Sequence, residues 1–242
     1  MSVDVTYFRI ERMIRSGAEC FLCALEDEIE RKYIDTYLSE LVMDAKAREK
    51  IVESRGFCNH HFYKMLIAAS KPESSDGHGI ALVNKNIVEK LVQYLHKHKG
   101  HPINDLHKLL VTENKCPACT YLSEFAKMYA EKIIELLSSG NDEFLKLLKE
   151  SKGLCIPHLV KLVQAAKDVD FTQSWKVIKN LLEIEERNLR RLNLELAEYV
   201  KRQSYEFSEK DRLAVADVVT RSVKKIAGRL GMKTLLSDKV LE

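Results

Sequence analysis

The sequence predicts an all-α protein made of two tandem three-helix repeats and a C-terminal helix. Three observations predict this fold class. Glycine and proline together make up about 5% of the 242 residues, against an average of about 12%, which argues against a β-sandwich, a barrel or a loop-rich scaffold. Apolar residues recur at steps of three and four along much of the chain, as in amphipathic helices. The six cysteines fall into two matching sets, which indicates an internal repeat.

The two sets share one pattern, in which a C-x2-C pair is followed by a C-x2-H pair. Their members are Cys20, Cys23, Cys58 and His61 in the first set, and Cys116, Cys119, Cys155 and His158 in the second. The spacers are 34 and 35 residues long, and residues 53–61 (ESRGFCNHH) align with residues 150–158 (ESKGLCIPH). We interpret this as a duplication with an offset of 96–97 residues. Only His61, not His60, aligns with His158, so we expect His61 to be the ligand.

The first helix of each repeat begins at its C-x2-C pair. Apolar residues recur with helical spacing over residues 22–41 and 121–137, and charged residues such as Asp27, Glu28 and Glu30 fill what we expect to be the solvated face of the first of these helices. Gly56 and Gly153 precede the C-x2-H pairs, and helical spacing resumes after them. Each C-x2-H pair is therefore predicted to lie at the start of a second, shorter helix.

A third helix is predicted in each repeat, over residues 80–94 and 172–206. The latter stretch contains no glycine or proline and could reach about 50 Å. Its apolar seam, from Trp175 to Tyr199, is interrupted at Glu185. A final helix is expected over residues 209–229, ending near Gly228. We therefore divide the chain into a first repeat (1–100), a second repeat (101–206) and a C-terminal helix and tail (207–242).

The cysteines and histidines predict metal binding. Three thiolates and one imidazole are the usual composition of a closed structural zinc site, and helix N-termini stabilise thiolates. We expect two zinc ions, with an iron–sulfur cluster as the alternative. The nearly equal spacers favour pairing of the ligands within each repeat, although the alternative in which Cys20 and Cys23 join Cys155 and His158 stays open.

Two other functions remain open at this point. The C-x2-C thiolates could serve as a redox- or metal-responsive switch. A zinc-dependent enzyme would need an open coordination position, with His60 or Glu53 as a base near the ion. No other nucleophile, acid–base pair or phosphate-binding loop is recognisable, so a zinc-stabilised interaction module without enzymatic activity is the favoured interpretation.

Composition restricts the partners and the location. The chain is 45% hydrophobic and 31% charged, with a net charge of +3, which indicates a folded core and neither a nucleic-acid nor a membrane-surface partner. The N-terminus lacks the features of a leader, and no run is apolar enough to span a membrane. We expect a cytoplasmic protein that binds a protein partner, as a monomer or a homodimer paired through the long helix.

The paired C-x2-C and G-[FL]-C-x2-H motifs, together with the closing Lys225-Ile226-Ala227-Gly228, resemble an uncharacterised family of bacterial and archaeal proteins of unknown function. The resemblance covers the chain from about Cys20 to Gly228. It implies that the doubled cysteine/histidine motif is the hallmark of the family, and it implies no activity.

Overall fold

The structure is a computed structural model that describes residues 4–70, 77–97, 99 and 116–232. Within these residues every regular element is a helix, so the predicted all-α class is confirmed. The chain forms two units. Unit 1 comprises residues 1–27 and 126–242, and unit 2 comprises residues 28–125. The boundary predicted between residues 100 and 101 and the tail from residue 233 lie outside the described residues.

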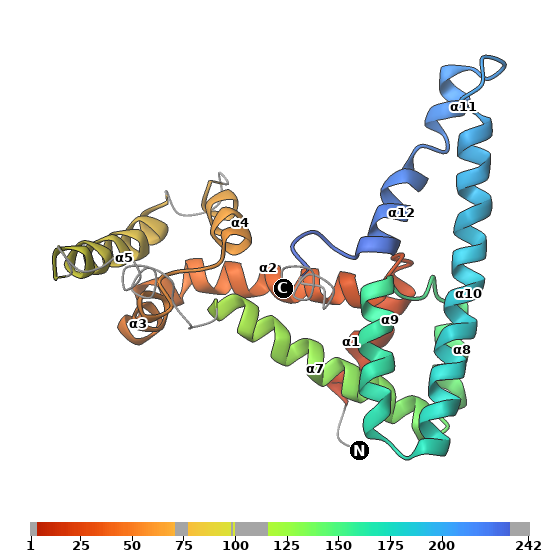
Figure 1. The fold of residues 1–242 in the computed structure, drawn as a ribbon, viewed down its shortest axis with the longest axis horizontal. Coiled ribbons are helices and arrows are strands. Elements are labelled where there is room, and N and C mark those ends of the chain that lie inside the picture. Colours follow the sequence, from red (N-terminus) through yellow and green to blue (C-terminus); the bar gives the residue numbers. More distant parts are fainter. Residues whose placement is uncertain (1–3, 71–76, 98, 100–115, 233–242) are drawn as a thin grey trace. The chain divides into compact units, whose positions relative to one another are not determined.

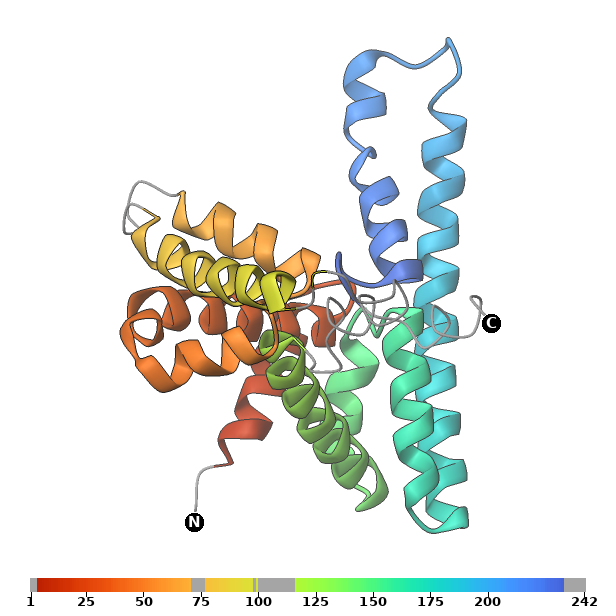
Figure 2. The same ribbon diagram turned by 60° about the vertical axis from the view of Figure 1, so that its left-hand side comes forward.

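Unit 1 begins with α1 (Val5–Arg15) and the first residues of α2 (Phe21–Ser39). It continues with the later part of α7 (Pro117–Ser138), α8 (Asp142–Glu150), α9 (Ile156–Ala165) and η2 (Ala166–Asp168). The long α10 (Phe171–Lys201), the short α11 (Glu209–Leu213) and α12 (Asp217–Ala227) complete it. The first half of α10 runs beside α9 and its second half beside α12 (Figures 1 and 2).

The core of unit 1 is apolar and draws on all of its chain segments. Its fully buried side chains include Ile10, Phe21, Tyr129, Phe144 and Leu162. The helices begin at polar caps, as in α8, where Asn141 Oδ1 accepts a hydrogen bond from the Phe144 N–H at 2.9 Å, and in α10, where Asp170 caps the first turn. Such caps satisfy N–H groups that have no partner within the helix.

Unit 2 contains the rest of α2, η1 (Leu41–Met43), α3 (Ala45–Glu53), α4 (Asn59–Ala69), α5 (His78–Lys97) and the start of α7. Helix α5 lies beside α3 and α4 (Figures 1 and 2). The core of the unit is aromatic. The ring of Phe57 packs edge-on against Tyr37 and Phe62, with centroid distances of 5.4 and 5.7 Å.

Several elements differ from the prediction. The structure adds α1, α3 and α8, and it divides the predicted final helix into α11 and α12. Helices α3 and α8 have nine residues each, too few for a clear periodic signal. The predicted three-helix repeat therefore omits a short helix between the long helix and each C-x2-H pair. The tandem-repeat organisation itself stays a prediction.

Candidate metal centres

The structure gathers the eight predicted ligands into two groups of four. Site 1 consists of Cys20, Cys23, Cys155 and His158, and site 2 consists of Cys58, His61, Cys116 and Cys119. Within each group the donor atoms lie within 4.8 Å of one another. All six cysteines are free thiols. Each group offers three sulfurs and one imidazole nitrogen, the donor set expected from the sequence.

This pairing differs from the one that the spacers favour. We expected each repeat to hold its own site, but each site instead combines the C-x2-C pair of one motif set with the C-x2-H pair of the other. The spacer is almost the same in both sets, so its length does not distinguish the two pairings. The packing of the helices decides between them, and it brings Cys20 and Cys23 to Cys155 and His158 in unit 1.

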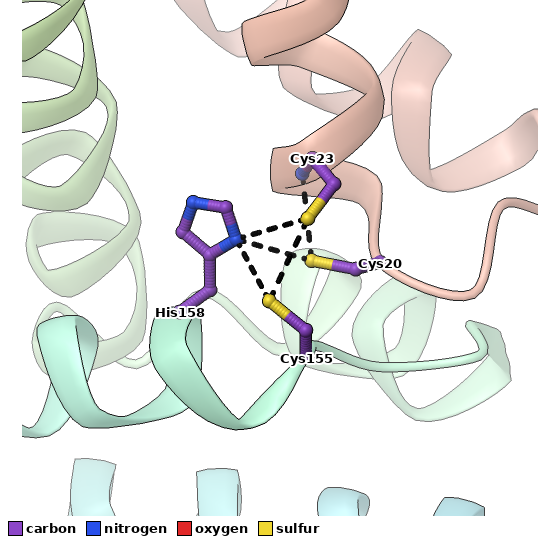
Figure 3. Close-up of side chains that lie close together, drawn as sticks. All are labelled: Cys20, Cys23, Cys155 and His158. Carbon is purple, nitrogen blue, oxygen red and sulfur yellow. Dashed lines mark hydrogen bonds between the residues drawn. The ribbon is translucent and has the colours of Figure 1, made fainter. Parts of the chain in front are cut away.

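The donors of site 1 converge on a common centre. His158 Nδ1 lies 3.3 Å from Cys20 Sγ, 3.4 Å from Cys23 Sγ and 3.1 Å from Cys155 Sγ. Cys23 Sγ and Cys155 Sγ are 3.5 Å apart. Figure 3 shows the imidazole facing the three sulfurs, with Cys20 and Cys23 at the start of α2 and the other two donors at the start of α9.

Site 2 has the same arrangement in unit 2. His61 Nδ1 lies 3.2 Å from Cys58 Sγ, 3.5 Å from Cys116 Sγ and 3.4 Å from Cys119 Sγ. Cys58 Sγ and Cys119 Sγ are 3.7 Å apart. The four donors come from the starts of α4 and α7. Each site is therefore built at the N-termini of two helices, as the motifs predicted.

The x2 spacing has a local structural reason. Cys58 and Cys155 are the N-caps of α4 and α9, and each histidine is the third residue of the helix that follows. The N-cap and N3 side chains lie on the same side of a first turn, so one turn presents two donors. The turn before α4 contains Arg55 and Gly56, both with positive φ (54° and 100°), and ends α3 by a Schellman-type hydrogen bond from the Gly56 N–H to the Ile51 carbonyl.

Each ligand histidine also contacts a buried carboxylate. His158 Nε2 lies 3.0 Å from Glu26 Oε1, and His61 Nε2 lies 2.9 Å from Glu30 Oε1. Such carboxylates fix the orientation of metal-binding histidines and raise their basicity. Neither carboxylate is among the ligands or bases expected from the sequence, and the expectation that Glu30 lies on a solvated face is wrong, because Glu30 is 0% exposed. Glu26 and Glu30 follow Cys23 by three and seven residues. This helical spacing places both carboxylates on the side of α2 that carries Cys23 and could have indicated their role.

The carboxylates have further cationic partners. Glu26 pairs with Lys161 at 3.7 Å and with Arg229 at 2.9 Å. Glu30 pairs with Lys64 and lies 3.0 Å from His60 Nε2. His60, considered above as a base, thus contacts the carboxylate behind the ligand histidine. Glu53, the other candidate base, is exposed and belongs to neither donor group.

A buried ion pair holds the chain segments that carry the ligands of site 1. Lys225 is 0% exposed, and its Nζ lies 2.7 Å from Glu185 Oε1. The same ammonium donates to the backbone carbonyls of Lys152 (2.6 Å) and Glu19 (3.1 Å). Glu185 Oε2 accepts a hydrogen bond from the Leu154 N–H at 2.8 Å. The carboxylate that interrupts the apolar seam of α10 therefore fixes the segment before Cys155.

The donors of each site strongly shift one another's pKa values. Burial opposes ionisation of Cys20, but hydrogen bonds from Cys155, Cys23 and His158 lower its pKa well below the ordinary value. In site 2, the hydrogen bond from Cys119 lowers the pKa of Cys116 to about 3. Burial opposes the charge on each ligand histidine, but the neighbouring cysteines and carboxylate raise the pKa of His158 well above its ordinary value and that of His61 to about 10. Each site thus stabilises a thiolate beside a protonated histidine. A divalent ion that binds there displaces the protons of the cysteines and the histidine and supplies the positive charge in their place.

Within the described part of the chain, no helix is long and apolar enough to cross a membrane. The chain matches no curated protein and no solved structure. A model of a family of unknown function, DUF6062, matches residues 1–233. This match covers both motif sets and the helices that carry them, and the chain belongs to this family.

Proposed function

We propose that the protein binds two zinc ions, one at each site, and that these ions stabilise an interaction module. The observation that carries the proposal is the convergence of three sulfurs and one imidazole nitrogen in each unit. We place the protein in the cytoplasm, where the reducing environment keeps such cysteines available to a metal.

The distances between donors support a single tetrahedral ion. With Zn–S of about 2.3 Å and Zn–N of about 2.0–2.1 Å, the edges of a tetrahedron are about 3.8 Å between sulfurs and about 3.6 Å between sulfur and nitrogen. The corresponding distances are 3.5 and 3.1–3.4 Å in site 1, and 3.7 and 3.2–3.5 Å in site 2. A disulfide needs about 2.05 Å between its sulfurs, so these separations favour a metal over a disulfide.

The same distances favour zinc over an iron–sulfur cluster. A cluster distributes its ligands over several iron atoms, which separates the ligands more than one ion does. Donors that all lie within 4.8 Å of one another suit one ion. Four protein donors also fill a tetrahedral zinc site, whereas a catalytic zinc keeps a position for water or substrate. We therefore assign both ions a structural role.

The stabilising effect follows from which segments the sites join. In site 1, the C-x2-C pair and the C-x2-H pair are separated by 132 to 138 positions in the chain. The entropy lost when such a long loop closes is large, and a bound ion supplies free energy to offset it. Structural zinc contributes on the order of 10 kcal/mol in small domains, so removal of the metal should unfold a unit.

Exposed apolar side chains support a role in binding a protein partner. On α12, three such residues follow helical spacing, namely Val219, Val223 and Ile226, and a fourth, Leu230, lies beyond the end of the helix at Gly228. On α10, Phe171 is 84% exposed and Trp175 is 67% exposed. Exposed apolar side chains grouped on one helix face are typical of an interaction site.

Chelation tests the structural role. A strong chelator should remove two zinc ions per chain and lower both the helical circular dichroism and the melting temperature, and zinc should restore them. Unchanged helicity and melting after complete metal removal would refute the structural role.

The proposed interaction surface has its own test. The variant Val223→Ser/Ile226→Ser should keep two zinc ions and the melting temperature of the wild type, because both side chains are exposed, but a protein that the wild-type chain captures should bind the variant more weakly. Retention of the partner at wild-type affinity would refute the assignment of this surface.

A further inference from the structure

The two sites have the same donors but differ in access to solvent. In site 1, Cys20, Cys23 and Cys155 are 4%, 9% and 0% exposed. In site 2, each of the three cysteines is partly exposed. Both ligand histidines are buried. The difference between the sites therefore lies at the cysteines, whose sulfur atoms are the atoms that oxidants and competing ligands attack.

The C-terminal end of α12 covers part of site 1. The backbone of Gly228 approaches the site so closely that an added Cβ would lie 3.5 Å from Cys155 Sγ. The next residue, Arg229, has a side chain that is 8% exposed and binds the carboxylate behind His158. This segment therefore helps to cover Cys155 Sγ and the carboxylate behind His158.

The surroundings of site 2 are more open. The carboxylate behind His61 is bound by Lys64 and His60, whose side chains are 33% and 20% exposed. Two of the sulfurs, those of Cys58 and Cys119, belong to partly exposed residues and are only 3.7 Å apart. A small oxidant can therefore reach two neighbouring thiolates in site 2, but it meets buried sulfurs in site 1.

We infer that site 2 is an oxidant-responsive site that releases its zinc on formation of a Cys58–Cys119 disulfide, whereas site 1 keeps its zinc as a permanent structural site. The inference rests on the proposed function, since it assumes that both sites hold zinc. The chemical class of the signal is a peroxide, which is small enough to reach partly exposed thiolates.

The reaction balances with one peroxide for each disulfide. One thiolate attacks a peroxide oxygen, the O–O bond breaks, and a sulfenic acid and a hydroxide ion form. The second thiolate attacks the sulfenic sulfur, an S–S bond forms, and a second hydroxide ion leaves. Two thiolates have then lost two electrons, and the peroxide has gained them. The remaining Cys116 and His61 are too few donors to hold the ion tightly, and zinc leaves with its charge unchanged.

Release at site 2 would loosen a defined part of unit 2. Ala118, which lies between Cys116 and Cys119 at the start of α7, belongs to the buried apolar cluster of this unit, together with Phe57 and Met65. The zinc ion would tie this turn of α7 to the start of α4. Its loss would free both helix ends from each other and expose the apolar residues between them, which provides a physical output for the oxidant signal.

The experiment follows zinc and thiols together in the full chain purified without oxygen. Native mass spectrometry should find two zinc ions before treatment; if it finds none, the proposed function fails and the inference falls with it. With limiting hydrogen peroxide, one ion should leave at least about tenfold faster than the other, and peptide mapping should find a Cys58–Cys119 disulfide with Cys20, Cys23 and Cys155 still reduced. Loss of both ions at one rate, or first oxidation within site 1, would overturn the inference while leaving the proposed function intact.

Two controls accompany this experiment. The first measures the access of solvent to each site without oxidation, and the second identifies which ion leaves. Exchange with isotopically labelled zinc, without peroxide, should also be faster at one site. The variant Cys58→Ser should retain one zinc ion that survives the peroxide concentration at which the wild type loses its first. If that remaining ion leaves as fast as the first ion of the wild type, site 2 is not the sensitive site.

Discussion

Replacing Lys225 by methionine tests whether the buried ion pair holds site 1 in place. The substitution keeps the approximate length of the side chain but removes the ammonium, which lies 2.7 Å from Glu185 Oε1 and donates to two backbone carbonyls. Glu185 is only 2% exposed, so its carboxylate would be left buried without a cation. Breaking a buried pair in this way costs about 3–5 kcal/mol, which lowers the equilibrium constant for folding roughly 150- to 5,000-fold.

Urea unfolding at a fixed excess of zinc measures this loss. The single tryptophan of the chain, Trp175, belongs to unit 1, so its fluorescence follows the unit that contains the ion pair. The double variant Lys225→Met/Glu185→Gln is the matched control, because its glutamine side chain keeps an acceptor for the Leu154 N–H and carries no charge. It should recover part of the lost stability. A single variant within about 0.5 kcal/mol of the wild type, or a double variant less stable than the single one, would refute the reasoning.

The loss should also depend on pH. Burial raises the pKa of Glu185, and in the wild type Lys225 opposes this effect. Without Lys225 the folded variant binds the proton of Glu185 more tightly than the unfolded chain does, so the stability of the variant falls as pH rises. The deficit relative to the wild type should therefore be larger near pH 8 than near pH 6, and a deficit that grows toward acid pH would contradict this account.

Three further predictions concern the sites and their support. The substitution Gly153→Ala should destabilise unit 1 by about 1–3 kcal/mol beyond Gly140→Ala, because both glycines have positive φ but only at Gly153 would a Cβ collide with a buried carboxylate; equal melting temperatures would contradict this. Glu26→Ala should lower the zinc affinity of site 1 about 10- to 100-fold in chelator competition, and Glu26→Gln, which keeps an acceptor for the histidine, should lose less; unchanged affinity in both would remove the positioning role. The double variant Cys58→Ser/Cys119→Ser should retain one zinc ion, since both residues belong to site 2, whereas pairing within each repeat would require the loss of both ions.

Local features of the fold could be predicted from the sequence because they depend on short spacings. The C-x2-C and C-x2-H motifs predict helix starts, and the structure places Cys58 and Cys155 at N-caps. Four-residue spacing along α10 predicts the ion pairs Glu183–Arg187, Glu186–Arg190 and Glu198–Arg202. The last two form, whereas Glu183 pairs with Lys179 and Arg187 donates to the Lys149 carbonyl. Such pairs need only the geometry of one helix.

Features that depend on packing could not be predicted in the same way. The pairing of Cys20 with Cys155 follows from how helices pack, and the nearly equal spacers of the two motif sets contain no information about it. Glu30 and Lys225 occupy positions that look like ordinary polar helix positions in the sequence, yet both are 0% exposed. A charged side chain is buried when a partner of opposite charge compensates for the loss of water. For Glu30 and Lys225 these partners are distant in sequence, so the sequence pattern of one helix does not reveal them.

X-ray absorption at the zinc edge reports the donors around each ion and so distinguishes the proposed sites from the alternatives. We expect two zinc ions per chain, each with three sulfur neighbours at about 2.3 Å and one nitrogen at about 2.0–2.1 Å, and with no second metal nearby. A metal–metal distance, iron with inorganic sulfide, or a protein without bound metal would contradict it.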